Sequence, residues 1–268
     1  MPTPFYHLFL AETLLKQPQL PVNIKHYLEP SRSEFLFGNT APDVQVVSGQ
    51  PRQETHFFNL PITAGAQPPW ERVLSKQPLL RANRLPQNQA AFMAGYLCHL
   101  QADWWWVKDI FAPIFGLHSS WATFPKRLYY HNVLRSYQEL QILPQLPPGL
   151  HGWLRQVEPD NWLPFVLDNQ LREWRDYLYP QLKTGAKIRT VEVFSSRQGI
   201  SAEEYYALLT SDERMTREVF SHFPFELLEK YQQRILVENI HLLSNYLAPS
   251  LHPAITHVQV KTIHGAQP

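Results

Sequence analysis

The sequence predicts an all-α protein built as a multi-helix bundle. Most of the chain repeats its apolar residues at helical spacing, and prolines separate these segments from one another. Only two stretches, residues 187–194 (KIRTVEVF) and 254–263 (AITHVQVKTI), alternate in the way that strands do. At 268 residues the chain can form one large domain or two small ones, with a sizeable hydrophobic core.

Three helices are expected in the first third of the chain. The first covers residues 4–16, where Phe5, Leu8 and Phe9 recur at helical spacing. The other two cover residues 23–28 and 68–84. Between them, the stretch EPSRSEFLFGNTAPDVQ is predicted to be a loop that leads into an exposed or site-lining turn, because it contains Gly38, Pro42 and several polar residues.

The clearest helix of the sequence begins at residue 88 and ends at residue 111 or 112 (88–111, or about 88–112). Asn88 is expected to cap its start and Pro113 to stop it. The segment is apolar nearly all the way round, which is typical of a helix that other helices pack against on several sides. We therefore expect it to lie buried at the centre of the bundle.

The rest of the chain is expected to add four more helices. They cover residues 126–140, 161–182, 201–220 and 225–247, and Ser201 with Glu204 forms a capping box at the start of the third. The proline-rich stretch ILPQLPPGL divides the chain at about residue 145. We expect residues 1–145 to form a helical core and residues 146–268 a helical extension packed on it as one domain.

Composition excludes several classes of protein. A hydrophobic share of 44% argues against disorder, and a net charge of +1 with no dense Lys/Arg cluster gives no reason to expect a stable nucleic-acid partner. Every long apolar run is interrupted by Gln, His or Asp, so no transmembrane segment is expected. The N-terminus lacks the features of a signal peptide, which makes the cytoplasm the expected location. Cys98 is the only cysteine, so a zinc site would have to use His, Asp and Glu.

Two polar residues stand out on the expected central helix. His99 and Asp103 are four residues apart, so their side chains lie on one face, one turn apart. Two metal ligands at this spacing can hold one ion without distorting the helix. The alternative is a hydrogen-bonded His–Asp pair inside a helical protein.

Three further residues extend the candidate set. His7 lies among apolar neighbours in the first helix, Asp43 follows Pro42 in GNTAPD, and His56 lies in ETHFF. Each has an ordinary alternative role: a core histidine, a turn former and a loop residue, respectively. It is their order along the chain, together with His99 and Asp103, that is informative.

This ordered set resembles the zinc-dependent phospholipase C family, whose fold is shared with zinc-dependent single-strand nucleases. The resemblance covers roughly residues 5–135 and rests on His7, FGNTAPDV, ETHFF and AFMAGYLCHLQADWWW. It implies an all-helical, metal-binding core with up to three zinc ions. By the same resemblance Asp43, His56 and His99 would hold one zinc, and Asp103 would bridge it to a second zinc that His7 also holds.

The sequence departs from the family pattern at the third zinc and at the chain start. Where the family has a histidine and a later His-x-x-x-carboxylate pair, this chain has Asp109 and then His131 with Arg135. Asp109 and His131 could still bind metal, but a guanidinium cannot. Arg135 could instead contact a substrate phosphate, or make a surface salt bridge. The chain begins Met-Pro-Thr instead of with the tryptophan whose amino group the family uses. Two zinc ions are therefore favoured over three.

The expected function is that of a metal-dependent phosphodiester hydrolase of the phospholipase C kind, in which a di-zinc cluster activates water. Asp43 is the candidate to orient that water or accept its proton. A phospholipid or a smaller phosphodiester is the preferred substrate. The alternatives are a metal-stabilised binding protein without catalysis and a nuclease of the same fold.

Trp104, Trp105 and Trp106 point about 100° apart, so two of them are expected to pack in the core.

Overall fold

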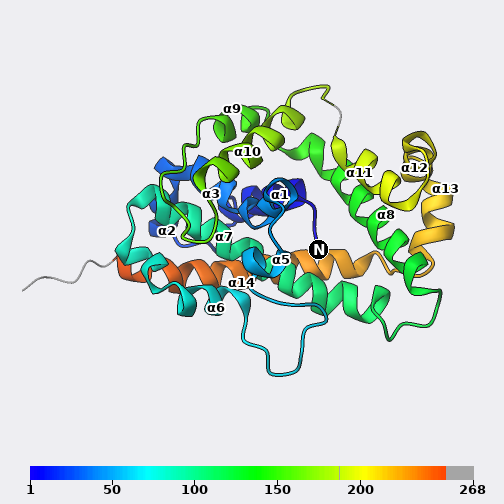
Figure 1. The fold of residues 1–268 in the computed structure, drawn as a ribbon, viewed down its shortest axis with the longest axis horizontal. Helices are drawn as coiled ribbons and strands as arrows, with labels where there is room; N and C mark the ends of the chain where they lie inside the picture. Colours follow the sequence, from blue (N-terminus) through cyan, green and yellow to red (C-terminus); the bar gives the residue numbers. More distant parts are fainter. Residues whose placement is uncertain (187, 252–268) are drawn as a thin grey trace, which may run out of the picture.

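The structure is a computed structural model that describes residues 1–186 and 188–251, and in these residues it is all-α with no strand, as the sequence predicts (Figure 1). The α-helices are α1 (Pro4–Leu15), α2 (Val22–Leu28), α3 (Arg32–Gly38), α4 (Gln45–Ser48), α5 (Arg52–His56), α6 (Pro69–Lys76), α7 (Gln87–Trp106), α8 (Phe124–Ile142), α9 (Leu150–Arg155), α10 (Asp168–Leu178), α11 (Arg189–Gln198), α12 (Ala202–Leu209), α13 (Asp212–Arg214) and α14 (Glu226–Leu251). Between them lie short 3-10 turns, of which η2 (Ala41–Val44) matters for the site, and two π-helical segments, η5 (Val107–Phe115) and η8 (Met215–Phe220).

Helix α7 is the buried centre of the molecule, as predicted. Its residues 90–104 are all buried, including the polar ones. The long helix α14 runs beside it (Figure 1), and the Tyr231 hydroxyl donates a hydrogen bond of 3.0 Å to the Ala102 carbonyl. A helix covered on every side gains most of its stability from apolar burial. The same burial removes water from any polar side chain that α7 carries.

Helix α3 crosses α7 at very short range because a glycine stands on each side of the contact. A Cβ atom on Gly95 would lie 2.0 Å from the Phe35 carbonyl oxygen, and one on Gly38 would lie 2.0 Å from that of Phe92. Only residues without a side chain permit this approach. The crossing brings the end of α3, and the η2 turn after it, against the face of α7 that carries His99.

The expectation of a loop over residues 29–45 is therefore wrong. The stretch forms α3 and η2, and Phe35, Leu36 and Phe37 are fully buried. Gly38 and the polar residues suggested a loop, but Gly38 ends a helix that tertiary packing against α7 stabilises. Tertiary contacts outweigh local propensity here.

The predicted ends of the central helix are also corrected. Helix α7 begins after Pro86, and the Asn88 side chain accepts a hydrogen bond from the amide of Gln89 and caps nothing further along. Beyond Trp106 the chain continues as the π-helix η5, and Pro113 lies inside that segment instead of stopping it. The π-helical hydrogen-bond pattern differs from the i→i+4 pattern that a proline interrupts.

Of the predicted strand over residues 187–194, the described residues 188–194 do not form a strand, contrary to the expectation from their alternation. The described part of this stretch lies mainly in α11, where Phe194 is buried and Gly199, with φ 67°, ends the helix. Residues 254–263, the other predicted strand, lie outside the described residues.

Three other predicted helices are shorter or interrupted. The helix predicted over residues 68–84 is α6 followed by two 3-10 turns, because Pro78 interrupts it. The one over 161–182 begins only at Asp168, and the one over 201–220 breaks at Thr210 and Ser211. Half of its predicted capping box is present, since the Ser201 hydroxyl accepts a hydrogen bond of 3.0 Å from the Glu204 amide.

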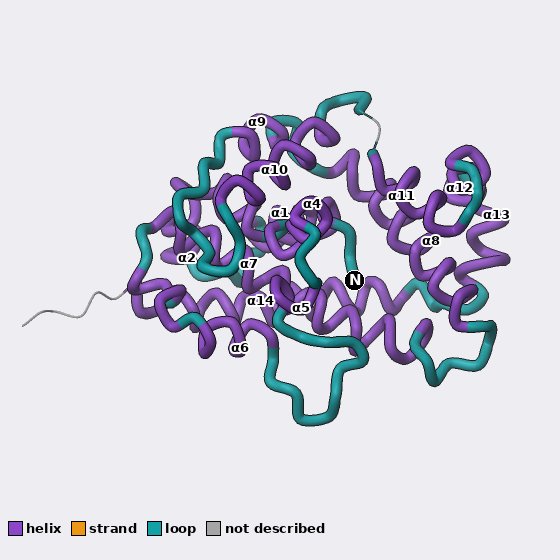
Figure 2. The backbone as a smooth tube through the Cα atoms, in the orientation of Figure 1, coloured by secondary structure: helices purple, strands orange, loops and turns teal. Residues whose placement is uncertain are grey.

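Helices from both sides of residue 145 surround α7 (Figure 2). Besides α14, helix α10 reaches the first half of the chain, where the Trp174 indole donates a hydrogen bond of 2.9 Å to the Thr40 carbonyl. No helix in residues 1–186 and 188–251 has the length and apolarity that crossing a bilayer requires.

Candidate metal centre

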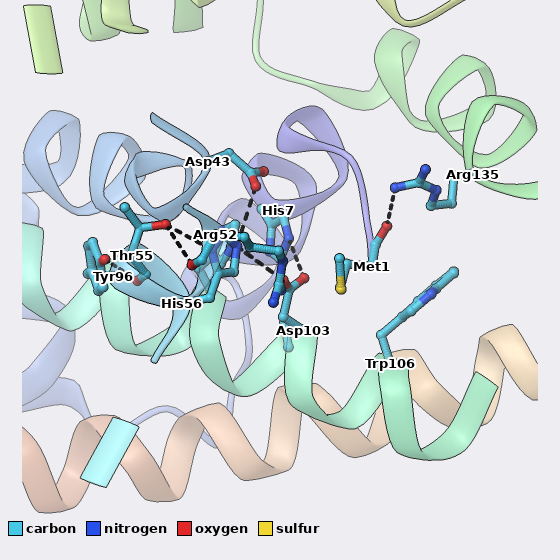
Figure 3. A network of polar contacts seen from close by, with 12 residues as sticks. Met1, His7, Asp43, Arg52, Thr55, His56, Tyr96, Asp103, Trp106 and Arg135 are labelled. Atoms are coloured by element: carbon cyan, nitrogen blue, oxygen red, sulfur yellow. Dashed lines mark hydrogen bonds and ion pairs between the residues drawn. The ribbon is translucent and has the colours of Figure 1, made fainter. Parts of the chain in front are cut away.

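Five side chains from four separate segments meet against the centre of α7. His7 comes from α1, Asp43 from the η2 turn, His56 from the end of α5 and Asp103 from α7 (Figure 3). His99 also lies on α7. They form two groups of three nitrogen or oxygen donors whose atoms lie within 4.8 Å of one another: His7, His99 and Asp103, and Asp43, His56 and His99. Five of the seven ligands that the sequence suggested are thus brought together.

The Asp103 carboxylate belongs to the first group and also contacts His56 of the second. Its Oδ1 is 3.4 Å from His7 Nε2, and its Oδ2 is 3.3 Å from His56 Nε2. Each oxygen faces a different imidazole, which is the arrangement that a carboxylate bridging two cations requires. Asp103 is 1% exposed, so water does not compensate its charge.

Backbone and hydroxyl groups orient two of the imidazoles. His99 Nδ1 lies 2.8 Å from the Asn39 carbonyl oxygen, which can only accept, so Nδ1 carries the proton. His56 Nδ1 lies 3.0 Å from the Thr55 hydroxyl oxygen, and that hydroxyl donates to the Arg52 carbonyl. His56 Nδ1 is therefore the donor in that contact. Such partners are the usual means by which proteins fix the tautomer of a ligating histidine.

The consequence is that unprotonated nitrogens face one another. With both Nδ1 atoms protonated, the Nε2 lone pairs of His99 and His56 meet at 3.3 Å. His7 stacks on His99 with ring centroids 3.7 Å apart, and its Nε2 is buried without a hydrogen-bond partner, as is Asp103 Oδ1. Buried polar atoms normally have partners. A cation among these atoms would satisfy them, so the residues present fit a metal.

The protonation states agree with this interpretation. Burial and the neighbouring His7 lower the pKa of His99 to about 3, so its imidazole is neutral at pH 7. Burial acts to raise the pKa of Asp103, but the imidazoles and the Arg52 guanidinium outweigh it and hold this pKa well below the ordinary value. Neutral imidazoles and ionised carboxylates are the forms in which these groups bind zinc.

Asp43 has a similar charge but a more open position. Burial acts to raise its pKa, yet the neighbouring imidazoles of His56 and His99 outweigh burial, and the pKa is lowered. Its Oδ1 lies 3.4 Å from His56 Nε2, and its side chain is 18% exposed. Asp43 is thus the cluster carboxylate that a molecule from solution can reach.

Arg52 is a member of the site that the sequence analysis missed. Its guanidinium donates a hydrogen bond of 2.7 Å to Asp103 Oδ2, and it lies over the Phe58 ring at 4.6 Å. The signal was present in the sequence, because Arg52 is four residues before His56 and so lies on the same face of α5. Asn39 and Thr55 act through backbone and hydroxyl groups, and no sequence pattern marks them.

Asp109 and His131 lie apart from the cluster. Asp109 is on η5 and pairs with Arg234 at 3.1 Å. His131 accepts a hydrogen bond of 2.9 Å from the Trp106 indole, and burial lowers its pKa well below the ordinary value. Within the described part of the chain, neither belongs to a group of three potential ligands.

Arg135 lies near the cluster with partners that carry no charge. Its guanidinium donates 3.0 Å to the Met1 carbonyl and also bonds Asn132, and it covers the Phe194 ring at 4.5 Å. Burial lowers its pKa to about 10, so it remains positive at pH 7. With Asp43 it lines a pocket of about 300 Å³.

The tryptophan run follows Asp103 directly on α7. Trp104 and Trp106 are buried, as expected for two of the three, and Trp104 packs edge-on against Phe58. Trp105 is partly buried beneath Arg234. The buried pair keeps water from the part of α7 that follows Asp103.

The model of the family described as zinc-dependent phospholipase C matches residues 6–141, just over half of the chain. The chain belongs to the zinc-dependent phospholipase C family. All five clustered side chains of this family member fall within the matched residues. The family name supports zinc as the metal. No curated protein and no solved structure matches the chain.

Proposed function

We propose that this member of the zinc-dependent phospholipase C family is a phosphodiester hydrolase that uses two zinc ions. One observation carries the proposal: two sets of three donors share His99, and Asp103 of the first set also lies 3.3 Å from His56 of the second. A single structural ion would need only one of these sets. Two adjacent sets joined by a carboxylate support a two-metal centre.

Asp43, His56 and His99 would hold one ion, and His7 with Asp103 would hold the other. Bound zinc supplies Lewis-acid stabilisation of the phosphate oxygens and lowers the pKa of water toward ~7. The protein's part is to keep the donors deprotonated and oriented. Asn39 and Thr55 fix two imidazoles, and the permanent charge of Arg52 keeps Asp103 ionised.

Asp43 is the proposed proton acceptor. Its lowered pKa means that it is ionised at neutral pH, and it is more exposed than Asp103. A carboxylate at the open edge of the cluster can hold the attacking water in line and take up its proton. We propose that Arg135, on the wall of the same pocket, contacts the substrate.

The family name implies a phosphodiester or lipid substrate. We propose a phospholipid or a smaller phosphodiester, with the scissile phosphate entering from the pocket beside Asp43. The near-neutral net charge offers little long-range attraction to a nucleic acid.

The test combines metal content with hydrolysis of a bis-aryl phosphate diester. We expect two zinc ions per chain, activity that chelation removes and added zinc restores, and loss of both metal and activity in His99→Ala. His26→Ala, on an exposed histidine of α2, is the matched control. Asp43→Asn addresses the acceptor role when it is assayed on protein that still holds two zinc ions, because Asp43 is also a proposed ligand. In that protein kcat should fall by at least about a hundredfold with KM little changed.

A chain that is folded, carries two zinc ions and hydrolyses no diester of any class would overturn the proposal. A second candidate function would then stand, namely a metal-stabilised binding protein. The observation that favours it is that Asp109 is engaged by Arg234 and His131 by Trp106, so neither is available to a third ion. One tightly held ion without hydrolysis would be its signature.

A further inference from the structure

The pocket beside the metal centre has two chemically different walls. One carries Asp43, which belongs to the cluster. The other is made largely by α10 and α11, from the half of the chain beyond the family match, together with Arg135 of α8. Arg135 and Arg197 both line this second wall. The C-terminal half therefore contributes directly to the space in which a substrate would lie.

The two guanidinium groups share one aromatic ring. Arg135 lies 4.5 Å from the centre of the Phe194 ring, and Arg197, on the same helix as that phenylalanine, lies 5.8 Å from it. Stacking on an aromatic ring holds a guanidinium in place and leaves its N–H edge free to donate. Two such groups on one ring form a local cationic site.

Neither arginine has an acidic partner among the described residues. Arg135 bonds only the Met1 carbonyl and the Asn132 amide oxygen, and its Nε is buried without any partner. The buried carboxyl one turn further along α8, Glu139, faces the hydroxyls of Thr3 and Thr190 instead. Arg197 is exposed and makes no ion pair within 4.0 Å among the described residues. The carboxylates of Asp43 and Asp103 act on Arg135 without forming a direct ion pair with it, whereas the neighbouring charge of Arg197 opposes that of Arg135. A bound anion would relieve the repulsion between the two guanidinium groups.

We propose that Arg135, Arg197 and Phe194 form a subsite for a second anionic group of the substrate, beyond the phosphate that is cleaved. The inference rests on the proposed phosphodiesterase function and specifies its substrate class. The group is a phosphomonoester or carboxylate on the part of the diester that occupies the α10–α11 wall. An anionic lipid headgroup and a soluble diester with a second phosphate both provide this chemistry.

The first experiment measures anion binding without catalysis. Sulfate, a dianion with the shape of a phosphate group, is titrated calorimetrically into the full-length, zinc-loaded protein. We expect Arg197→Gln to weaken sulfate binding by about tenfold, because a charge-assisted contact is lost. Arg197 is exposed, so its replacement should not disturb folding. Arg155→Gln removes the same charge from an exposed site on α9 and is the matched control.

The second experiment measures selectivity. Pairs of diesters that differ only in one anionic group are compared by kcat/KM, once as lipids in neutral vesicles and once as water-soluble compounds. We expect the anionic member to be preferred, and the preference to fall about tenfold in Arg197→Gln and not in Arg155→Gln. Preference in vesicles alone identifies a lipid headgroup, whereas preference in both arms identifies the charge itself.

Sulfate binding that Arg197→Gln leaves unchanged, or hydrolysis that is indifferent to the second anionic group, overturns the subsite. The two proposals fail separately. If sulfate binding depends on Arg197 in a protein that hydrolyses no diester, the subsite is supported and the phosphodiesterase function is the proposal that fails.

Discussion

Asp103 is a buried carboxylate that faces two imidazole nitrogens and one guanidinium at the same time. Burying a carboxylate costs several kcal/mol unless positive charge compensates it. The positively charged Arg52 donates a hydrogen bond to Oδ2 of Asp103. The other oxygen, Oδ1, is left without a hydrogen bond. The protein thus compensates the negative charge of Asp103 only in part, and a bound metal ion would supply the remaining positive charge.

Replacing Asp103 by Asn should reduce the metal content from two ions toward one. The amide has nearly the same shape but cannot bridge two dications with a negative charge. Metal per chain, measured by elemental analysis of protein purified without chelator, tests this. Asp109→Asn is the matched control, because Asp109 pairs with Arg234 on the surface and should not affect the metal. An equal loss in the control would place Asp109 in the cluster after all.

Glu139 makes stability depend on pH in a predictable direction. Burial raises the pKa of this carboxyl from 4.5 to about 7. A raised pKa in the folded state means that the stability present below pH 4.5 is lost as the pH rises toward 7. Glu139→Gln removes the ionisation. Between pH 4.5 and 7.5 the unfolding free energy of this variant, relative to wild type, should therefore rise by about 3 kcal/mol.

Urea unfolding at several pH values measures this difference, with the exposed Glu203→Gln as control. If the difference between Glu139→Gln and wild type is constant across the range, the carboxyl does not titrate as its burial implies.

At the scale of the elements, the crossing of α3 and α7 determines where the site residues lie. The close approach of Gly38 to the Phe92 carbonyl, and of Gly95 to the Phe35 carbonyl, sets the separation of the two helices. Asn39 follows α3 directly, and its carbonyl holds His99 in its tautomer. Asp43 follows four residues later. The spacing of the two helices therefore determines the position of Asp43 and the orientation of His99.

Gly95→Ala should destabilise the protein by about 3 kcal/mol and also reduce its affinity for metal. The new methyl would fall 2.0 Å from a backbone carbonyl, so the helices must move apart. Gly152→Ala is a suitable control because nothing lies within 4 Å of the added carbon. Denaturant unfolding and zinc titration measure the two effects. A variant as stable as the control would mean that the crossing can relax without cost.

The elements that the sequence predicts well are those whose apolar residues recur over several turns, such as α1, α7, α8 and α14. Helix α3 was missed because its stability comes from contacts with α7, which no local pattern contains. Residues 188–194 alternate because β-branched side chains recur there, but α11 forms with Phe194 turned inward. The order of His7, Asp43, His56, His99 and Asp103 along the chain predicted a cluster, since the family pattern encodes that order. Arg52 and Arg197 belong to no such pattern.

At the scale of the whole molecule, the C-terminal half packs on the first half through buried contacts. The hydroxyls of Tyr231 and Tyr246, both on α14, donate to the carbonyls of Ala102 and Leu80. Helix α11 contributes Phe194 and Arg197 to the pocket beside the metal centre. Removal of this half would expose the apolar surface of α7 to water.

We therefore expect the full chain to unfold in one cooperative transition. Far-UV circular dichroism and tryptophan fluorescence should give coincident thermal curves, and a fragment of residues 1–145 should not fold. Two separated transitions, or a stable fragment, would show that the chain contains two domains that fold independently.

The sequestered thiol of Cys98 has a practical consequence for identifying the metal. Cys98 precedes His99 on α7 but is 1% exposed in the apolar core, and burial raises the pKa of its thiol. The donors of the cluster are consequently only nitrogen and oxygen. If cobalt(II) replaces zinc, the protein should display weak visible ligand-field bands without the intense near-ultraviolet absorption that thiolate–cobalt bonds produce. A spectrophotometer can thereby separate ions loaded in the native centre from ions captured by unfolded chains.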